Sequence, residues 1–309
     1  MIVSKTYMSK SLLVTGANGQ LGSELSQLAP LYPEFNFTFV TRAELDLTNT
    51  ESIHLWFADK TFDVIINCAA YTAVDKAESE PDVAKAINTL AVEALATIAK
   101  EQSCSLIHVS TDYVFAGKNY QPYQESEPTA PQGVYGQSKL AGEQALLAIN
   151  PPKSVLIRTA WVYSSFNYGP KQHNEKLIPT IIRKAIGGEL IPIYGDGKNI
   201  RDWLYVLDHC KGIDLVYHKG NVGEVYNIGG RNERTNNYIA DKVCEILDSL
   251  RPKAAGSYKD QLNFVEDRAG HDKRYAIDAS KIESELGWQA DENFETGIVK
   301  TIEWYLNRN

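Results

Sequence analysis

Cysteine is scarce in this sequence, and no two cysteines stand in a Cys-x-x-Cys spacing. The 309 residues include four cysteines that lie far apart along the chain: Cys68, Cys104, Cys210 and Cys244. This pattern predicts neither a disulfide framework nor a zinc-binding motif, and we expect buried, reduced thiols instead. The six histidines also lack a metal-ligand spacing such as His-x-x-x-His, so no intrinsic metal site is predicted.

Long apolar runs and clusters of positive charge are missing as well. No uninterrupted apolar stretch approaches the roughly 18 to 20 residues of a membrane span, and the opening MIVSKTYMSK lacks the long apolar run of a secretory signal. Lysine and arginine are scattered, and the formal net charge is −8, which argues against a nucleic-acid-binding surface. We therefore expect a cytoplasmic protein that binds neither membrane nor nucleic acid, and whose partner is a small molecule.

The first half of the sequence contains short apolar runs that alternate with helix-length segments. An apolar content of 43% over this length suffices for one large or two modest domains. Strand candidates cover residues 11–16, 35–41, 63–70, 104–110 and 154–160. Helix candidates cover residues 20–29, 51–60, 82–102 and 135–149. Right-handed crossovers between such strands predict an α/β fold with a doubly wound parallel sheet, a Rossmann-like domain over residues 1–165.

The second half has a different amino-acid composition, with more glycine, proline and asparagine. Strand candidates are short and cover residues 190–195, 224–230 and 262–267. Helix candidates cover residues 176–188, 236–250 and 295–308. We therefore expect a smaller, mixed α/β substrate lobe over residues 166–309, able to exchange segments with the first domain.

A glycine-rich turn, TGANGQLG, follows the first strand candidate and opens the first helix candidate. Glycines there allow a tight turn and bring backbone N–H groups close to a pyrophosphate, and the helix N-terminus adds partial positive charge. A turn with no ligand is the plainer alternative. The residues that we expect to contact a dinucleotide here are Gly16, Asn18, Gly19, Gln20, Leu21 and Gly22.

The end of the second strand candidate bears on the choice of coenzyme. An NAD-specific site commonly has an acidic residue there, whereas this chain reads FVTRAELDL. Arg42 suits a 2′-phosphate, which favours NADPH and leaves NADH open, with a plain surface arginine as the alternative. Further coenzyme contacts are expected from Asp46, Leu47, Ala70, Tyr71, Thr72 and Val109.

The motif YGQSK places Tyr135 and Lys139 four residues apart at the start of a helix candidate, and therefore on one face. A lysine ammonium near a phenol stabilises the phenolate, so the tyrosine could exchange a proton with an oxygen near neutral pH. This spacing is common by chance. Together with the glycine turn and Thr111 at the end of the fourth strand candidate, it predicts an oxidoreductase site.

With these three features the sequence resembles the extended short-chain dehydrogenase/reductase family. The resemblance implies that Tyr135 is the acid/base, that Lys139 lowers its pKa and anchors the nicotinamide ribose, and that Thr111 orients the substrate oxygen. By analogy with the family, a homodimer is also possible.

Two narrower resemblances meet within the chain. GANGQLG, STDYVFAG and YGQSKLAGE resemble dTDP-4-dehydrorhamnose reductases, whereas IPIYGDGKNIRDWLYVLDH and VYNIGGRNERTN resemble dTDP-glucose 4,6-dehydratases. Both handle dTDP-linked hexoses. The resemblance implies substrate contacts from Asp112, Trp161, Asn167, Lys176, Leu177, Tyr194, Arg201, Asn236 and Arg268.

One position separates the two chemistries. In the dehydratase pattern the Thr-Asp pair is followed by a glutamate that removes the C5 proton, and this chain has Tyr113 instead. A tyrosine, with an ordinary pKa of about 10, is a poor substitute for that base. We therefore expect reduction of the C4 ketone of dTDP-4-dehydro-6-deoxy-D-glucose to dTDP-D-fucose. The alternatives are a dTDP-4-dehydrorhamnose reductase, a dehydratase and a coenzyme-binding module without turnover.

Overall fold

The computed structural model describes residues 9–163, 176–267 and 273–307, without the side chains of Trp161 and Tyr163. The chain divides into two compact units whose segments alternate along the sequence. The first unit comprises residues 1–114, 131–157 and 213–225. The second comprises residues 115–130, 158–212 and 226–309, whereas the sequence suggests a single boundary near residue 165.

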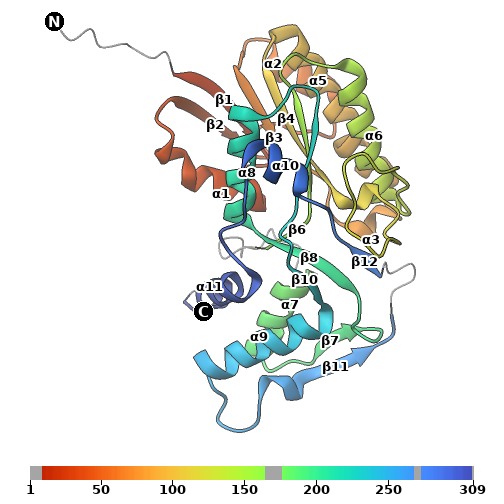
Figure 1. The fold of residues 1–309 in the computed structure, drawn as a ribbon. Coiled ribbons are helices and arrows are strands. Elements are labelled where there is room, and N and C mark those ends of the chain that lie inside the picture. Colours follow the sequence, from red (N-terminus) through yellow and green to blue (C-terminus); the bar gives the residue numbers. More distant parts are fainter. Residues whose placement is uncertain (1–8, 164–175, 268–272, 308–309) are drawn as a thin grey trace, which may run out of the picture. The chain divides into compact units, whose positions relative to one another are not determined.

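A six-stranded sheet runs in the order β2-β1-β3-β4-β5-β9 (Figure 1). Its strands are β1 (Lys10–Thr15), β2 (Phe35–Val40), β3 (Val64–Asn67), β4 (Ser105–Thr111), β5 (Val155–Thr159) and β9 (Val225–Ile228). The pairs β1 with β2, β1 with β3 and β3 with β4 are parallel. This confirms the predicted doubly wound, Rossmann-like fold, because sequential strands sit on both sides of β1.

Helices of the first unit alternate with these strands. They are α1 (Gln20–Leu28), η1 (Ala29–Leu31), α2 (Thr50–Phe57), α3 (Val74–Ala77), α4 (Pro81–Lys85), η2 (Ala86–Leu90), α5 (Ala91–Gln102), η3 (Asp112–Val114) and α6 (Val134–Ile149). The segment predicted as one helix over residues 82–102 is continuous but contains a π-helical turn, η2. Such single turns widen the helix and often occur at functional sites.

The second unit contains two small sheets. Strand β8 (Ile200–Tyr205) lies between β10 (Glu233–Thr235) and β12 (Arg274–Tyr275) and also pairs with β6 (Trp161–Tyr163). Strand β7 (Ile191–Tyr194) pairs with β11 (Leu262–Val265). The helices are α7 (Leu177–Ile186), α9 (Asn236–Leu250), η4 (Tyr258–Gln261), α10 (Ser280–Leu286) and α11 (Phe294–Leu306), while α8 (Val206–Lys219) spans both units.

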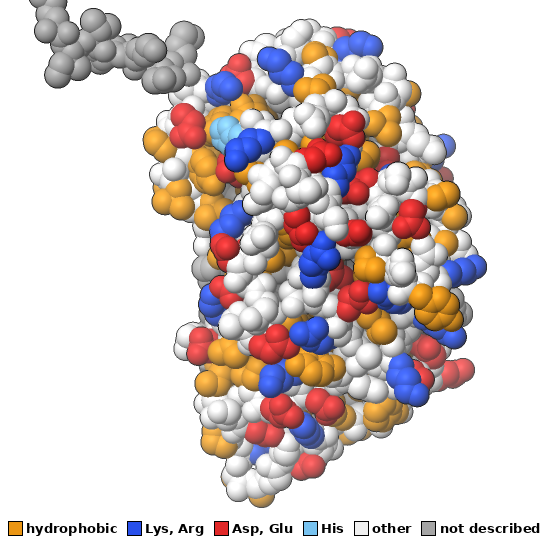
Figure 2. All heavy atoms as spheres, viewed as in Figure 1, with side chains coloured by type: hydrophobic (Ala, Val, Ile, Leu, Met, Phe, Trp, Pro, Cys, Tyr) orange, Lys and Arg blue, Asp and Glu red, His pale blue; other side chains and the backbone are white. Residues whose placement is uncertain are grey.

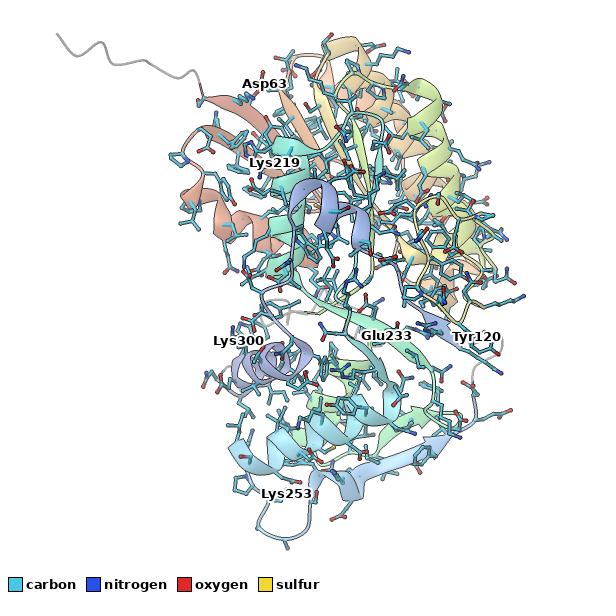
Figure 3. The ribbon with its side chains drawn as sticks, viewed as in Figure 1. Asp63, Tyr120, Lys219, Glu233, Lys253 and Lys300 are labelled. Carbon is cyan, nitrogen blue, oxygen red and sulfur yellow. The ribbon has the colours of Figure 1, made fainter. Side chains whose placement is uncertain are left out.

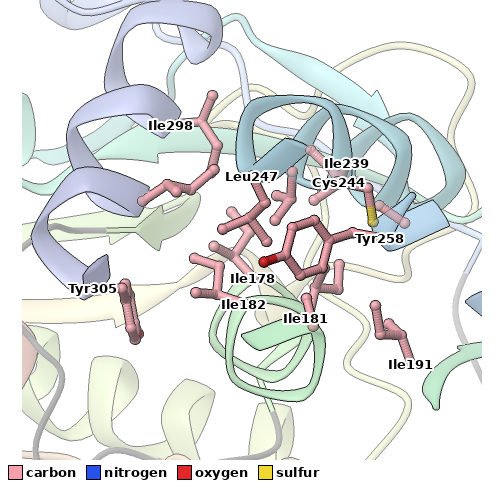
Figure 4. Packing of buried hydrophobic residues seen from close by; sticks show 14 of the residues in the cluster. Ile178, Ile181, Ile182, Ile191, Ile239, Cys244, Leu247, Tyr258, Ile298 and Tyr305 are labelled. Atoms are coloured by element: carbon pink, nitrogen blue, oxygen red, sulfur yellow. The ribbon is translucent and has the colours of Figure 1, made fainter. Parts of the chain in front are cut away.

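Each unit has its own apolar core. In the first, Leu13, Ile65 and Leu106 of three adjacent strands pack with residues of α2, α5 and α6. In the second, α7, α9 and α11 enclose a cluster that includes Ile181 and Leu247 (Figure 4). These cores fix the strands whose ends carry the polar residues described below.

Charged side chains of both signs are interspersed on the face shown in Figure 2. Some form short local contacts: Asp63, labelled in Figure 3, accepts hydrogen bonds from the Ser11 backbone N–H at 2.7 Å and hydroxyl at 2.9 Å. Among the residues that the structure describes, no helix is both long and apolar enough to cross a bilayer. Within the same residues, no group of three His, Cys, Asp or Glu side chains converges as a metal site would require.

Candidate active site

The glycine turn connects β1 to α1 by a close backbone approach. Gly16 has a φ of +70°, a conformation that suits glycine, and the Gly19 N–H donates to its carbonyl at 2.8 Å. A Cβ on Gly22 would lie 2.3 Å from the same carbonyl oxygen, so helix and turn can pack this closely only without a side chain. Asn18 and Gly19 are exposed, whereas Gln20 and Leu21 are partly buried. No side chain caps the start of α1, and this turn fits a pyrophosphate.

A second segment predicted to contact the coenzyme follows β3. A Cβ on Gly16 would lie 2.9 Å from Ala69 N, so the two turns are in close contact. Ala70, Tyr71 and Thr72 continue this segment and are partly exposed.

Asn88 holds that second segment in place, although no motif in the sequence indicates this role. Its Oδ1 accepts from the Tyr71 N–H at 2.9 Å, and its Nδ2 lies 3.0 Å from both the Tyr71 carbonyl and the Ser138 hydroxyl. Ser138 donates in turn to the Tyr135 carbonyl at 2.8 Å. Asn88 lies on the π-helical turn and is 1% exposed.

Thr111 ends β4, and Tyr135 and Lys139 lie in the first turns of α6. All three are buried, and the Thr111 side chain is near enough to Tyr135 to oppose the rise in its pKa. The Lys139 ammonium donates to the Val109 carbonyl at 2.8 Å, which fixes it against β4. The arrangement provides a hydroxyl pair for one substrate oxygen, with a buried cation on the same helix face.

Burial dominates the titration of these groups. It raises the pKa of Tyr135 well above 10, with the Thr111 hydrogen bond acting in the opposite direction. It lowers the pKa of Lys139 to about 8, against the nearby charge of Glu143. The expected lowering of the Tyr135 pKa by Lys139 is not found: burial and the Asp112 charge raise this pKa, and the ammonium is directed at the Val109 carbonyl.

Asp112 and Tyr113 continue from Thr111 into η3. The Thr111 hydroxyl donates to Asp112 Oδ1 at 3.1 Å, and the carboxylate is 2% exposed. The Tyr113 ring meets the Tyr135 ring edge to face, with centroids 5.5 Å apart. A tyrosine ring therefore lies beside the expected acid/base.

The predicted adenosine side of the site is more exposed. Arg42 is 73% exposed at its side chain, and its Nε lies 3.7 Å from Asp46 Oδ1. Asp46 also accepts from the backbone and hydroxyl of Thr48, at 3.0 and 2.9 Å. Leu47 is buried. This part of the chain therefore offers an exposed guanidinium whose ion pair with Asp46 is long and weak.

The predicted substrate contacts of the second unit lie on several of its elements. Lys176 is the N-cap of α7, Leu177 begins that helix, and Tyr194 ends β7 and is 38% exposed. Asn236 begins α9, and its N–H donates to the Asn199 carbonyl at 3.1 Å.

Arg201 is 3% exposed on β8, with its guanidinium 5.3 Å from the centre of the Tyr275 ring. A bidentate ion pair spans the neighbouring strands, from Arg274 on β12 to Glu233 on β10 (labelled in Figure 3), at 2.6 and 2.7 Å. Asn167 and Arg268 lie outside the described residues, as does the Trp161 side chain.

Fold and site together define the class of this chain. A Rossmann-like sheet with this glycine turn, joined to Thr111, Tyr135 and Lys139, is the arrangement of an NAD(P)-dependent oxidoreductase of the extended short-chain dehydrogenase/reductase type. A family model described as "RmlD substrate binding domain" matches residues 10–269, and the chain belongs to this family.

Its relatives act on dTDP-linked sugars. A dTDP-glucose 4,6-dehydratase of Xanthomonas campestris pv. campestris is 40% identical over 260 residues, which cover 79% of this chain and 72% of that protein. The structure of a dTDP-glucose 4,6-dehydratase from Bacillus anthracis in complex with NAD is 32% identical, with a TM-score of 0.79 and coverage of 96% and 97% of the two chains. A dTDP-4-dehydrorhamnose reductase from the same organism, in complex with NADP, is 28% identical, with a TM-score of 0.78 and coverage of 97% and 99%. The chain is thus an enzyme of a class whose members are NAD(P)-dependent and act on sugar nucleotides.

Proposed function

We propose that this enzyme reduces the C4 ketone of dTDP-4-dehydro-6-deoxy-D-glucose to dTDP-D-fucose, with NADPH as the preferred reductant, in deoxysugar biosynthesis. The observation that carries the proposal is the residue after the Thr-Asp pair. Tyr113 packs against Tyr135 where the dehydratase pattern has a carboxylate base. The glutamate that removes the C5 proton in the dehydratase pattern is thus replaced by Tyr113, whereas ketone reduction needs only Thr111, Tyr135, Lys139 and a hydride donor.

Thr111, Tyr135 and Lys139 would each have a separate role in this reduction. A reduced nicotinamide, when bound, would supply the hydride for C4. Tyr135 and Thr111 hold the C4 oxygen between their hydroxyls, and Tyr135 gives its proton to that oxygen as the carbonyl becomes an alcohol. Tyr135 is protonated at neutral pH, and the burial that raises its pKa opposes release of that proton. A Lys139 ammonium that leaves the Val109 carbonyl would stabilise the tyrosinate until solvent returns the proton.

The residues of the glycine turn and of the segment after β3 would bind the coenzyme pyrophosphate and nicotinamide half, and Arg42 would meet a 2′-phosphate. The dTDP group would be bound in the second unit by Lys176, Arg201 and Asn236. Arginine suits a diphosphate because its planar donors bind two oxygens at once.

A coupled assay tests the proposal. The enzyme is incubated with dTDP-glucose, a separate 4,6-dehydratase and NADPH, in the presence or absence of a 3,5-epimerase. The proposal expects NADPH oxidation without the epimerase. Oxidation only with the epimerase would instead identify a dTDP-4-dehydrorhamnose reductase. Conversion of dTDP-glucose by this enzyme alone, without added reductant, would identify a dehydratase, the activity of the curated relative at 40% identity.

A further inference from the structure

The linking segment, residues 115–130, joins the two expected catalytic hydroxyls along the chain. It begins four positions after Thr111 and ends five positions before Tyr135. Both of these residues belong to the first unit, whereas the linking segment is part of the second unit. Whatever fixes the linking segment in the second unit therefore restrains the chain just after Thr111 and just before Tyr135.

Residues 274–278 hold the linking segment through its backbone. The Tyr123 N–H donates to the Ala276 carbonyl at 3.0 Å, and the Asp278 N–H donates to the Tyr123 carbonyl at 2.8 Å. The Tyr123 ring is stacked on the Phe115 ring, with centroids 4.5 Å apart, and this contact extends the attachment to the start of the segment. The position of the linking segment therefore depends on β12 and the residues that follow it.

The ring of Tyr275 contacts both the linking segment and Arg201. Tyr275 is 1% exposed, and it pairs with Arg201 in the parallel register of β12 and β8 (Figure 1). The Arg201 guanidinium lies 5.3 Å from the ring centre, a distance at which an aromatic face attracts a cation. Gly117 lies at the hydroxyl end of the same ring, and its φ is +66°. A Cβ on Gly117 would be 2.9 Å from Tyr275 Cζ and 3.1 Å from Oη, so the backbone and the ring can approach this closely only without a side chain.

We propose that Tyr275 is a positioning residue that couples a diphosphate bound at Arg201 to the linking segment, and through that segment to the two catalytic hydroxyls. The inference rests on the proposed function, in which Arg201 binds the diphosphate of the dTDP group. A shift of the guanidinium on binding moves the ring that faces it, and the close approach at Gly117 transmits the movement because packed groups cannot shift independently. Binding energy from the nucleotide, which is remote from C4, then contributes to the placement of the reacting groups.

A methyl group at Gly117 tests this coupling, because it would press on the Tyr275 ring from a residue that is not an expected substrate contact. The matched control is Gly188→Ala. Gly188 has a φ of +70°, and apart from its chain neighbours no atom of the described residues lies within 4 Å of its Cβ position. Both substitutions impose similar backbone strain, but only Gly117→Ala meets the ring. For each full-length variant we would measure the Kd for dTDP, the Kd for NADPH, KM and kcat separately, and Tm.

We expect Gly117→Ala to raise the Kd for dTDP and to lower kcat, each by about 10-fold, because small misplacements in a preorganised site are costly. Gly188→Ala should lower Tm by a similar amount and leave the Kd for dTDP and kcat within about twofold of wild type. The Kd for NADPH should stay within about twofold of wild type in both variants, since the expected coenzyme contacts belong to the first unit.

Tyr275→Leu and the double variant Gly117→Ala/Tyr275→Leu complete a double-mutant cycle. Tyr275→Leu alone should also weaken dTDP binding by about 10-fold, whereas Tyr275→Phe keeps the ring and should stay within about threefold of wild type. Adding Gly117→Ala to Tyr275→Leu should change the Kd for dTDP by less than about twofold, because the ring that the methyl group would meet is gone. Equal Kd values for dTDP in Gly117→Ala and Gly188→Ala, or additive effects in the double variant, would overturn the proposal. Wild-type protein that does not bind dTDP, or an Arg201→Leu variant with wild-type affinity for dTDP, would instead refute the substrate assignment of the proposed function.

Discussion

Tyr113 and Tyr135 meet edge to face, with ring centroids 5.5 Å apart and planes inclined at 75°. The contact places an aromatic ring next to the expected acid/base at the position after the Thr-Asp pair. Burial raises the pKa of Tyr135, and the nearby Asp112 and Tyr113 act in the same direction.

Tyr113→Glu tests this relationship. A carboxylate beside Tyr135 opposes formation of the tyrosinate, so we expect kcat for ketone reduction to fall by about 10-fold or more at pH 7. Tyr113→Phe keeps the ring contact and should stay within about threefold of wild type. A Tyr113→Glu enzyme as active as wild type would show that the ring does not influence the reaction.

Tyr135→Phe removes the proton donor and leaves the fold intact, because the ring still fills its buried position. The expected loss in kcat is about 10²- to 10⁴-fold, the usual contribution of a positioned acid. Steady-state kinetics at saturating coenzyme measure it, with circular dichroism as the control for folding. Near-wild-type turnover would remove Tyr135 from the reaction.

Arg42→Ala addresses coenzyme choice. Because this guanidinium is exposed and its contact to Asp46 is long, we expect it to be available to a 2′-phosphate. We expect KM for NADPH to rise about 10-fold and KM for NADH to change by less than twofold. If the two constants change equally, Arg42 does not distinguish the coenzymes.

Glu24 of α1 makes stability depend on pH. It is 2% exposed, and burial raises its pKa from 4.5 to about 7. A carboxyl whose folded-state pKa is raised contributes fully below pH 4.5, and its contribution is lost as pH rises through 7. Glu24→Gln should therefore be more stable than wild type by about 3 kcal/mol at pH 8 and equal to it at pH 4. Urea denaturation at the two pH values measures both; a constant difference would contradict the assignment.

Most of the predictions made from the sequence rest on patterns among neighbouring residues. The strand-turn-helix at Gly16 and the four-residue spacing of Tyr135 and Lys139 depend on neighbouring residues, so the sequence displays them directly. Strand β8 was missed as an element because Arg201 and Asp202 interrupt its apolar pattern. Asp202 is nevertheless buried, since the N–H groups of Gly230 and Asn232 donate to it at 2.8 and 2.7 Å.

Contacts between distant residues had no sequence signal. Asn67 and His108 are 41 positions apart, and only the strand register brings them together. The hydrogen bond from the Tyr71 N–H to Asn88 also joins distant residues, because the π-helical turn that carries Asn88 lies against the segment after β3. The partners of Asn67 and Asn88 are distant in the sequence, so the structure was needed to show that these two asparagines belong to the candidate site.

The most direct test of the central claim is NMR of the sugar nucleotide formed from dTDP-4-dehydro-6-deoxy-D-glucose and NADPH without an epimerase. The proposed function predicts a reduced D-sugar with an axial C4 hydroxyl, dTDP-D-fucose. Unchanged ketone under conditions in which the epimerised L-sugar is reduced would contradict it.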